Sequence, residues 1–329
     1  MNMVRFLARR TLFYAFTAWA AITLNFLLPR LMPGDPVAAI LLANPGMEPG
    51  AARALRVLFG LDQGQSLWQQ YIDYWGLLLR GDLGSSFSFG LAPVSSIISG
   101  GLPWTIGLVG IATIITFALG TSIGALIGWK RGSIADYIVP ITTFISTVPF
   151  FWLALIIIAV FSVQLGWFPT SHAYQIGMVP NWSWDFVGSV IYHGILPAAT
   201  IVIASLGGWI LGMRNMMMTV LDEDYITVAH AKGLSSWRVM SKYATRNAIL
   251  PQIQSFALSL GFVVSGTLIL EMVFSYPGIG LLLVNAVRAR DFPLVQGIFL
   301  VITFSVLAAN IVADLAYAVL DPRTRQTES

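Results

Sequence analysis

Cysteine is absent from this chain of 329 residues, and only three histidines occur. The lack of thiols excludes disulfide bridges, cysteine nucleophiles and cysteine-ligated metals. Neither His172 nor His193 has another histidine at a metal-ligand spacing, so no metal site is expected. The H-E-x-x-H pattern is also missing, and three imidazoles offer little acid–base chemistry. These absences argue against a membrane enzyme.

Charged residues are scarce as well, at 10% of the chain against 57% hydrophobic residues. A soluble domain carries roughly 25% charged residues. The charges present cannot coat a soluble globule of this length, so lipid must replace the missing polar surface. The composition therefore predicts an all-α polytopic membrane protein, with about 20 apolar residues in each span.

Apolar runs separated by charged or Pro/Gly-rich breaks indicate about six spans. They lie near residues 10–30, 104–129, 136–165, 193–214, 252–274 and 294–319. The first run is interpreted as a retained span, because it is too long for a typical signal-peptide core and no A-x-A-like site follows it. Gly120, Gly124 and Gly128 recur every four residues in the second run, which predicts a face of small residues that packs closely on a neighbouring helix.

The positions of Lys and Arg predict the orientation of the chain. With the N-terminus inside, twelve of the 18 basic residues fall on the cytoplasmic side and six outside. Cytoplasmic loops carry the excess of basic residues, so both termini are expected to be cytoplasmic. The long segment 32–102 is then extracytoplasmic, and residues 69–75 within it predict a short amphipathic helix. The aromatic segment 166–190 is expected to form an interfacial belt rather than a ligand cage.

A polar loop of about thirty residues, Asp222 to Pro251, separates the fourth and fifth runs. It begins with three acids and becomes basic, an order that suits the helix macrodipole. Gly233 is well placed to end a first helix, and Ser235 can cap a second. Pro251 is expected to restart the chain at the next span. From the residues alone, a knob that docks a soluble partner and a basic loop held on anionic lipid are equal alternatives.

Several motifs, in order along nearly the whole chain, resemble those of one protein family. The loop motif is Ala229-His230-Ala231-Lys232-Gly233-Leu234-Ser235, followed by Arg246-Asn247-Ala248-Ile249-Leu250-Pro251. The others are Pro33-Gly34-Asp35-Pro36, the G-D-L-G-S-S string at 81–86, the E-M-V-F-S-Y-P-G-I-G string at 271–280, and Asp314-Leu315-x-Tyr317 with Asp321-Pro322-Arg323. Together they resemble the B-type permease subunit of bacterial ABC importers of the dipeptide/oligopeptide/nickel family. His230 and Tyr243 depart from that pattern, in which Arg and His are usual.

The resemblance implies a single permease domain, 1–329, in the bacterial inner membrane, with a cytoplasmic coupling loop at 215–251. The chain would form half of a path for short peptides delivered by an extracytoplasmic binding protein. Its other partners would be a homologous C-type permease, two cytoplasmic ATPases and membrane lipid, with no nucleic acid. No G-x-x-x-x-G-K-[ST] phosphate loop is present. ATP and Mg would therefore be used by the ATPases, and this chain would bind no cofactor and would not be an enzyme.

The resemblance also assigns candidate site residues. Those expected to couple to the ATPase are Glu223, Asp224, Tyr225, Ala229, Ala231, Lys232, Gly233, Leu234, Arg246, Asn247 and Pro251. Glu271, Asp314 and Arg214 are charges that would either line the path or stabilise the bundle. A structural role is favoured for Glu271 and Asp314, because both fall in motifs shared by relatives with different substrates. Small hydroxyl residues are expected along the path: Thr105, Thr113, Ser146, Thr147, Thr200, Ser205, Ser259 and Ser265.

Other functions stay open at this point. The same machinery would also fit oligosaccharides, whose rings stack on aromatic residues, or nickel. An ion-coupled secondary transporter is the alternative class, but it predicts inverted repeats with paired broken spans. No convincing internal repeat is visible in this sequence.

Overall fold

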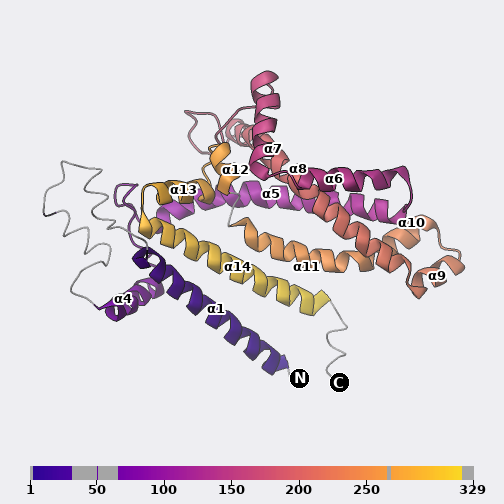
Figure 1. Ribbon diagram of the computed structural model, residues 1–329, viewed down its shortest axis with the longest axis horizontal. Helices are drawn as coiled ribbons and strands as arrows, with labels where there is room; N and C mark the ends of the chain where they lie inside the picture. Colours follow the sequence, from indigo (N-terminus) through magenta and orange to yellow (C-terminus); the bar gives the residue numbers. More distant parts are fainter. Residues whose placement is uncertain (1–2, 32–49, 51–65, 265–267, 321–329) are drawn as a thin grey trace. The chain divides into compact units, whose positions relative to one another are not determined.

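The computed structural model describes residues 3–31, 50, 66–264 and 268–320, and it is almost entirely helical there. The predicted all-α class is confirmed. Over these residues, three helices are long and apolar enough to cross a membrane: α5 (Val94–Trp129), α8 (Trp184–Leu221) and, over 292–312, α14 (Phe292–Leu320) (Figure 1). The count of six spans and the cytoplasmic termini stay predictions. The P-G-D-P motif at 33–36 and the D-P-R motif at 321–323 lie outside the described residues.

The third predicted span, 136–165, is wrong as a single helix. A short 3₁₀ turn, η1 (Ile134–Tyr137), leads into α6 (Ile138–Ser146), and α7 (Phe150–Ile157) with the π-helical η2 (Ile158–Gln164) follows at an angle of 99°. Pro149 stands at the break in an extended conformation, with ψ at 135°. Proline lacks an N–H and disfavours a helical residue before it, so it divides the apolar run. If the bent pair counts as one span, the part of the chain that the structure describes holds up to four candidate spans.

Other boundaries also moved from their expected positions. α5 begins at Val94 rather than near 104, because its internal Pro103 does not end the helix. α8 extends the fourth run at both ends, and Ser183 caps it by accepting a hydrogen bond from the Phe186 backbone N–H at 3.3 Å. The fifth run is divided between α11 (Thr245–Val263) and α12 (Leu268–Val273).

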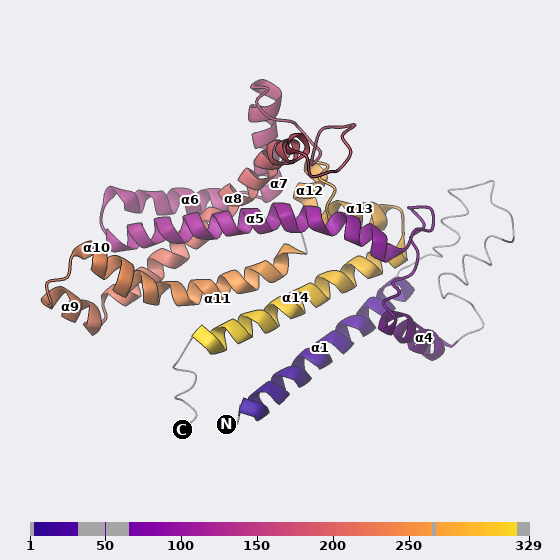
Figure 2. The ribbon, with the colours of Figure 1, turned by 180° about the vertical axis from the view of Figure 1, so that it is seen from behind.

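The chain forms two compact units, and each is described by itself. The first comprises residues 1–103 and 281–307. It contains α1 (Met3–Leu31), the predicted amphipathic helix α4 (Leu67–Leu79), and parts of α5, α13 (Ile279–Arg288) and α14. Figure 2 shows α4 crossing α1 near the C-terminal end of α1.

Asp291 organises the loop of this unit that contains the G-D-L-G-S-S motif. The Asp291 carboxylate is fully buried and accepts hydrogen bonds from the Ser88 N–H at 3.0 Å, from the Ser88 hydroxyl at 2.8 Å and from the Ser86 hydroxyl. Its second oxygen accepts the Leu294 N–H at 3.3 Å, so the same side chain caps the start of α14. Gly84, with φ at +82°, provides the turn before the bound serines.

The second unit, residues 104–280 and 308–329, is built around α8. The predicted glycine face of α5 is confirmed, because Gly120, Gly124 and Gly128 lie against α8. A Cβ on Gly124 would stand 2.5 Å from the Ile210 carbonyl oxygen and 2.8 Å from the Met213 Cβ.

Residues 120–124 also match the G-x-S-x-G pattern, but they lie within a continuous helix. The strand-to-helix turn that exposes a catalytic serine in that motif is therefore missing here.

The contact between α5 and α8 gives a direct test. We expect Gly124→Ala to lower the melting temperature of the detergent-purified protein, because overpacking a close contact costs about 1–3 kcal/mol. Gly107→Ala is the matched control on the same helix, since a Cβ there meets no atom within 4 Å. The control should keep or slightly raise stability, as alanine favours helix by about 1 kcal/mol over glycine. Equal melting temperatures for the two variants would contradict the close contact.

Candidate functional site

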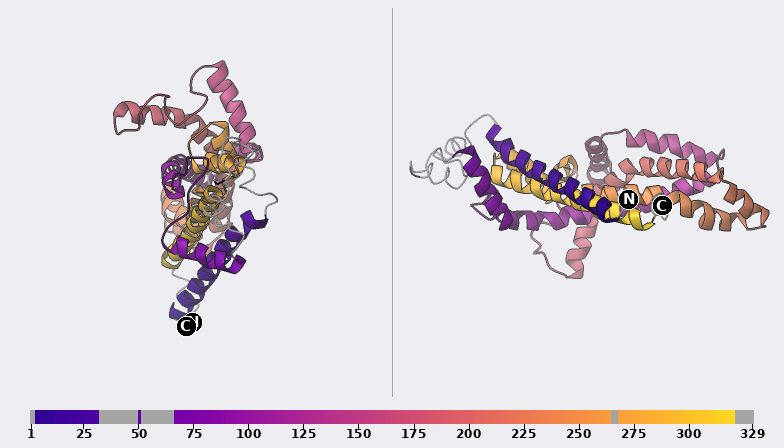
Figure 3. Two further views of the ribbon diagram at one scale, coloured as in Figure 1. Left: turned by 90° about the vertical axis from the view of Figure 1, so that its left-hand side faces the viewer. Right: turned by 90° about the horizontal axis from the view of Figure 1, so that it is seen from below.

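The polar loop folds into the predicted helix, glycine turn and helix. α9 (Asp224–Ala231) is the first helix; the second begins with α10 (Ser236–Arg238) and continues through the π-helical η3 (Val239–Ala244) into α11. Ser235 stands at the predicted cap position, although its hydroxyl makes no capping hydrogen bond. The expectation for Pro251 is wrong, because it lies inside α11 rather than at a helix start. These helices occupy one end of the second unit (Figure 3).

Gly233 ends α9 in the left-handed conformation, with φ at +73°. Its N–H donates to the His230 carbonyl at 2.9 Å, and the Leu234 N–H donates to the Ala229 carbonyl at 3.4 Å. These two bonds form a Schellman motif, which satisfies carbonyls at the end of a helix. Leu234 packs on the adjoining apolar cluster, as the motif usually requires of the residue after the glycine. The chain direction after α9 is thus set by one backbone conformation that favours glycine.

One side of the loop is anchored to the membrane helices. Ile226 and Ala229 on α9 are buried in a cluster with Met213 and Met217 of α8. The other members of this cluster are Ala125, Val239, Met240, Ala244 and Ala248. Ala229, a predicted coupling residue, therefore faces inward and holds α9 in place.

The other side of α9 faces outward. Glu223, Asp224, Ala231 and Lys232 are exposed there, and Val228 is exposed to 51%. The predicted residues of the second helix, Arg246, Asn247 and Pro251, are exposed as well. The predicted coupling residues are thus divided between an outer surface, the buried Ala229 and the turn at Gly233 and Leu234.

Asn247 joins the two helices of the loop. Its side-chain amide donates to the Tyr225 hydroxyl at 3.0 Å and to the Tyr243 carbonyl at 2.9 Å. The two positions that depart from the family pattern are His230 and Tyr243. His230 stacks on Trp129 at the end of α5, with ring centroids 6.2 Å apart, and Tyr243 is 38% exposed. Both departures therefore lie at the surface or edge of the loop and not in its core.

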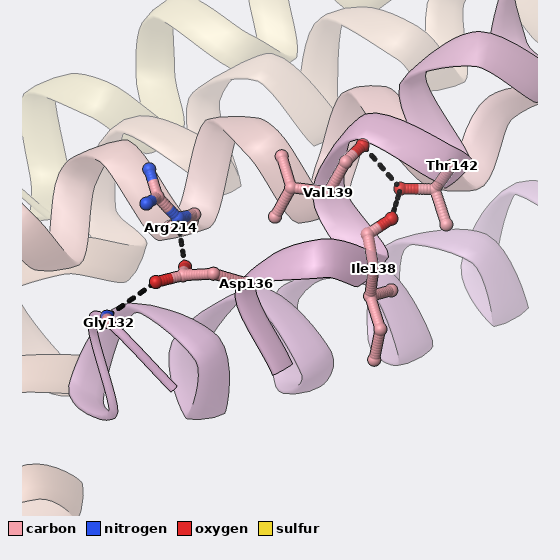
Figure 4. Close-up of polar contacts among 6 residues, drawn as sticks. All are labelled: Gly132, Asp136, Ile138, Val139, Thr142 and Arg214. Carbon is pink, nitrogen blue, oxygen red and sulfur yellow. Dashed lines mark hydrogen bonds and ion pairs between the residues drawn. The ribbon is translucent and has the colours of Figure 1, made fainter. Parts of the chain in front are cut away.

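Arg214 forms an ion pair within the second unit. Its Nε donates to an Asp136 carboxylate oxygen at 2.9 Å, and the other oxygen accepts the Gly132 N–H at 2.5 Å (Figure 4). Each side chain of the pair is about a quarter exposed, at 23% and 24%. The pair joins η1, at the start of the broken span, to α8, two turns before α8 reaches the loop. This geometry favours the bundle-stabilising alternative for Arg214, and that role stays a prediction.

Glu271 is fully buried and joins three elements of the second unit. One carboxylate oxygen accepts the Thr105 hydroxyl at 2.9 Å, and the other accepts the Gly280 N–H at 2.8 Å. Thr105 in turn accepts the Ile279 N–H at 2.8 Å. The first N–H groups of a helix lack helical partners and attract negative charge. A Cβ on Gly278 would overlap the Glu271 carboxylate and the Thr105 hydroxyl, which explains the first glycine of the P-G-x-G string. The favoured structural role of Glu271 agrees with this geometry.

The negative charge of Glu271 also acts on a neighbouring phenol. Tyr276 lies in the turn after α12 and is only 3% exposed. Burial first, and the nearby Glu271 carboxylate second, raise the pKa of Tyr276 to about 12. Ionisation of this phenol, which would place a second negative charge in the turn, is thus displaced to more alkaline pH.

The hydroxyl residues expected along a path are mostly engaged within the protein. Thr105 and Thr200 are fully buried, and the Thr200 hydroxyl donates to the Leu196 carbonyl at 2.8 Å in its own helix. Thr113 and Ser259 make similar bonds within their helices. Asp314 lies partly buried in α14, whereas Ser265 lies outside the described residues.

Asp291 was missed by the sequence reasoning, although its place just before a helix beginning Phe292-Pro293 is a capping signal.

Comparison with known proteins agrees with the motifs. Residues 120–326 match the family described as binding-protein-dependent transport system inner membrane component. The chain is 34% identical, over 98% of its length and 99% of the relative, to an oligopeptide transport system permease protein of Bacillus subtilis (strain 168). It is 37% identical, over 92% of its length and 93% of the relative, to a putative peptide transport system permease protein of Brucella abortus (strain 2308). It is also 34% identical, over 98% of its length and 99% of the relative, to a di/tripeptide transport system permease protein of Pseudomonas aeruginosa (strain UCBPP-PA14).

The ion pair between Asp136 and Arg214 is testable by exchange of charge. We expect Asp136→Arg and Arg214→Asp each to lower the melting temperature, because each leaves two like charges in contact. The double variant should recover part of the loss, with a coupling of about 1 kcal/mol for a partly exposed pair.

The matched control for this exchange is the exposed pair of Arg131 and Asp222, whose atoms are 3.5 Å apart. Arg131→Asp should change the melting temperature little, because exposed pairs contribute little. Additive losses in the Asp136/Arg214 double variant would contradict a direct interaction between the two side chains.

Proposed function

This chain belongs to the family of inner membrane components of binding-protein-dependent transport systems, and from that premise we propose that it conducts short peptides as one permease subunit of an ABC importer. A permease of this family does not itself hydrolyse ATP, which is the task of separate ATPase subunits. The names of the three relatives all specify peptide, oligopeptide or di/tripeptide transport. They favour peptides over oligosaccharides or nickel as the cargo.

The proposed mechanism rests on one observation, that α9 has a buried side and an exposed side. Ile226 and Ala229 anchor the helix to α8 through Met213 and Met217, while the opposite side is exposed. A partner that binds the exposed side and moves would therefore move the end of α8 with it. We assign this partner as a cytoplasmic ATPase subunit and α9 as the coupling helix. Asn247 extends the same motion to the second helix through Tyr225.

The proposed assembly contains four kinds of subunit. A homologous C-type permease supplies the other half of the path, and two ATPases bind ATP and Mg on the cytoplasmic side. An extracytoplasmic binding protein, which the family description itself names, delivers the peptide. The ion pair between Arg214 and Asp136 would transmit displacement of α8 to η1 and so to the cytoplasmic half of the broken span.

Reconstitution tests the cargo and the energy source together. With the full complex in proteoliposomes, uptake of a labelled di- or tripeptide should require the binding protein and ATP on the ATPase side. Uptake should persist when ion gradients are collapsed by ionophores. Uptake without ATP that disappears with the ion gradient would instead support a secondary transporter. Uptake of an oligosaccharide or of Ni²⁺ in place of peptide would contradict the proposed cargo.

The turn at Gly233 tests the coupling role of α9. We expect Gly233→Asp to abolish peptide uptake while the chain still inserts, because a side chain opposes its positive φ by roughly 1–2 kcal/mol. No atom lies within 4 Å of the added Cβ, so the variant creates no steric clash within the chain.

Gly177→Asp is the matched control, with φ at +92° and equally open surroundings before α8. It should leave uptake largely intact at equal membrane abundance. Normal uptake by the Gly233 variant would refute the coupling role, and equal loss in both variants would point to a general folding defect.

A further inference from the structure

The helix α4 has three distinct sides. One side lies against α1 and carries Gln70, Tyr71 and Tyr74. A second side is polar, where the Gln69 side-chain amide donates to the Asp73 carboxylate at 3.3 Å. The third side is apolar and exposed. The left panel of Figure 3 shows α4 lying across α1 rather than along it.

Contacts with the last two turns of α1 fix the position of α4. The Tyr71 hydroxyl lies 2.7 Å from the Thr23 hydroxyl, and the Asn25 amide donates to the Tyr74 hydroxyl at 3.2 Å. The Arg30 Nε donates to the Gln70 side-chain oxygen at 3.1 Å. Between these bonds, the Phe26 ring contacts Tyr71 and Tyr74, with centroids 5.2 and 5.5 Å apart. α4 is thus attached where α1 passes from apolar residues to a charged one, Arg30.

The exposed apolar side is substantial for so short a helix. Trp68 is 69% exposed, Ile72 45% and Leu79 81%. At 100° per residue these three positions fall within one narrow sector, whose centre lies about 120° from Asp73 around the helix. Such a stripe in water would forfeit the free energy of burying its apolar area, at about 25 cal/mol per Å².

We propose that α4 is an interfacial helix, whose stripe of Trp68, Ile72 and Leu79 is immersed in the bilayer at the boundary between headgroups and acyl chains. The exposed side of α1 is itself apolar, with Phe16, Trp19 and Leu24 from 48% to 63% exposed. α4 is attached near the C-terminal end of this helix. Tryptophan is enriched at that depth, and a helix with one apolar side and one polar side lies in the plane of the interface.

The charge of α4 defines the kind of lipid contact. Asp73 is the sole charged residue from Leu67 to Leu79, and a single basic residue, Arg80, follows at the C-cap, so the segment carries no net charge. Attraction to anionic headgroups requires basic residues. The helix therefore recognises the apolar boundary of the bilayer, independently of headgroup charge. This role concerns the membrane alone and does not depend on the proposed cargo or on coupling to an ATPase.

The absence of cysteine makes the test direct, since any introduced cysteine is the one labelling site in this chain. Spin labels are placed at Trp68→Cys, Ile72→Cys and Leu79→Cys, and at the control sites Gln69→Cys and Asp73→Cys on the same helix. The full complex is reconstituted in phosphatidylcholine liposomes, with and without phosphatidylglycerol. Accessibility to oxygen, which concentrates in lipid, is compared with accessibility to a water-soluble nickel chelate.

Spin labels at the three stripe sites should be more accessible to oxygen than to the nickel chelate, in both lipid mixtures. Labels at the two control sites should show the reverse. Nickel access at the stripe would overturn the proposal in favour of a solvated helix. Low access to both reagents at the stripe in the assembled complex would overturn it in favour of a protein partner. A preference for oxygen that appears only with phosphatidylglycerol would contradict independence from headgroup charge.

A second measurement avoids labels altogether. Trp68→Phe keeps an apolar ring, and the fluorescence difference between this variant and the unchanged protein isolates the signal of Trp68. Lipids brominated near the headgroup end of the acyl chain should quench that difference more strongly than lipids brominated near the terminal methyl. Absence of quenching by either lipid would sink the proposal.

Discussion

The close approach of α5 to α8 is the contact on which the second unit depends. Three glycines on α5 admit the α8 backbone, and the same contact places Met213 and Met217 where they bury Ile226 and Ala229 of α9. A side chain at Gly124 would therefore disturb the helix pair and also the support of the loop beyond it. In a chain surrounded by lipid, this packing has little help from the hydrophobic effect, so shape complementarity between helices carries more of the stability.

Charge in this protein is used mainly to begin and join helices. Buried Asp291 caps α14, and buried Glu271 accepts an N–H from the first turn of α13. Asp136 holds a backbone N–H and Arg214 together. The two buried carboxylates, Asp291 and Glu271, meet donors that would otherwise be unpaired in an apolar setting, where an unsatisfied polar group is expensive. Asp136 does so at a partly exposed position. An intramembrane carboxylate in this family architecture is thus a poor guide to the substrate path unless its partners are known.

Features that depend on neighbours in the chain were predictable, and features that depend on distant partners were not. The four-residue spacing of the glycines, the end of α9 at Gly233 and the amphipathic helix near Tyr71 are all local patterns. The partner of Arg214 lies 78 residues away and that of Asp291 more than 200, so no local signal pairs them. Pro149 and Pro251 show the remaining difficulty. One stands at a helix break and the other lies inside a helix, so the presence of a proline alone did not predict where a helix ends.

Two different constraints act on residues close to the turn at Gly233. The glycine is required by its backbone angle, and Ala229 is required by the space beside α8, but neither requirement reaches the outward side of α9. Substitutions on that side leave the anchor and the turn untouched. Under the proposed coupling role of α9, such a permease can acquire a surface matched to a different soluble subunit through a few exchanges of exposed residues, with its folding unaffected. Sister transport systems in one cell could therefore keep their subunits apart while sharing a common helical framework.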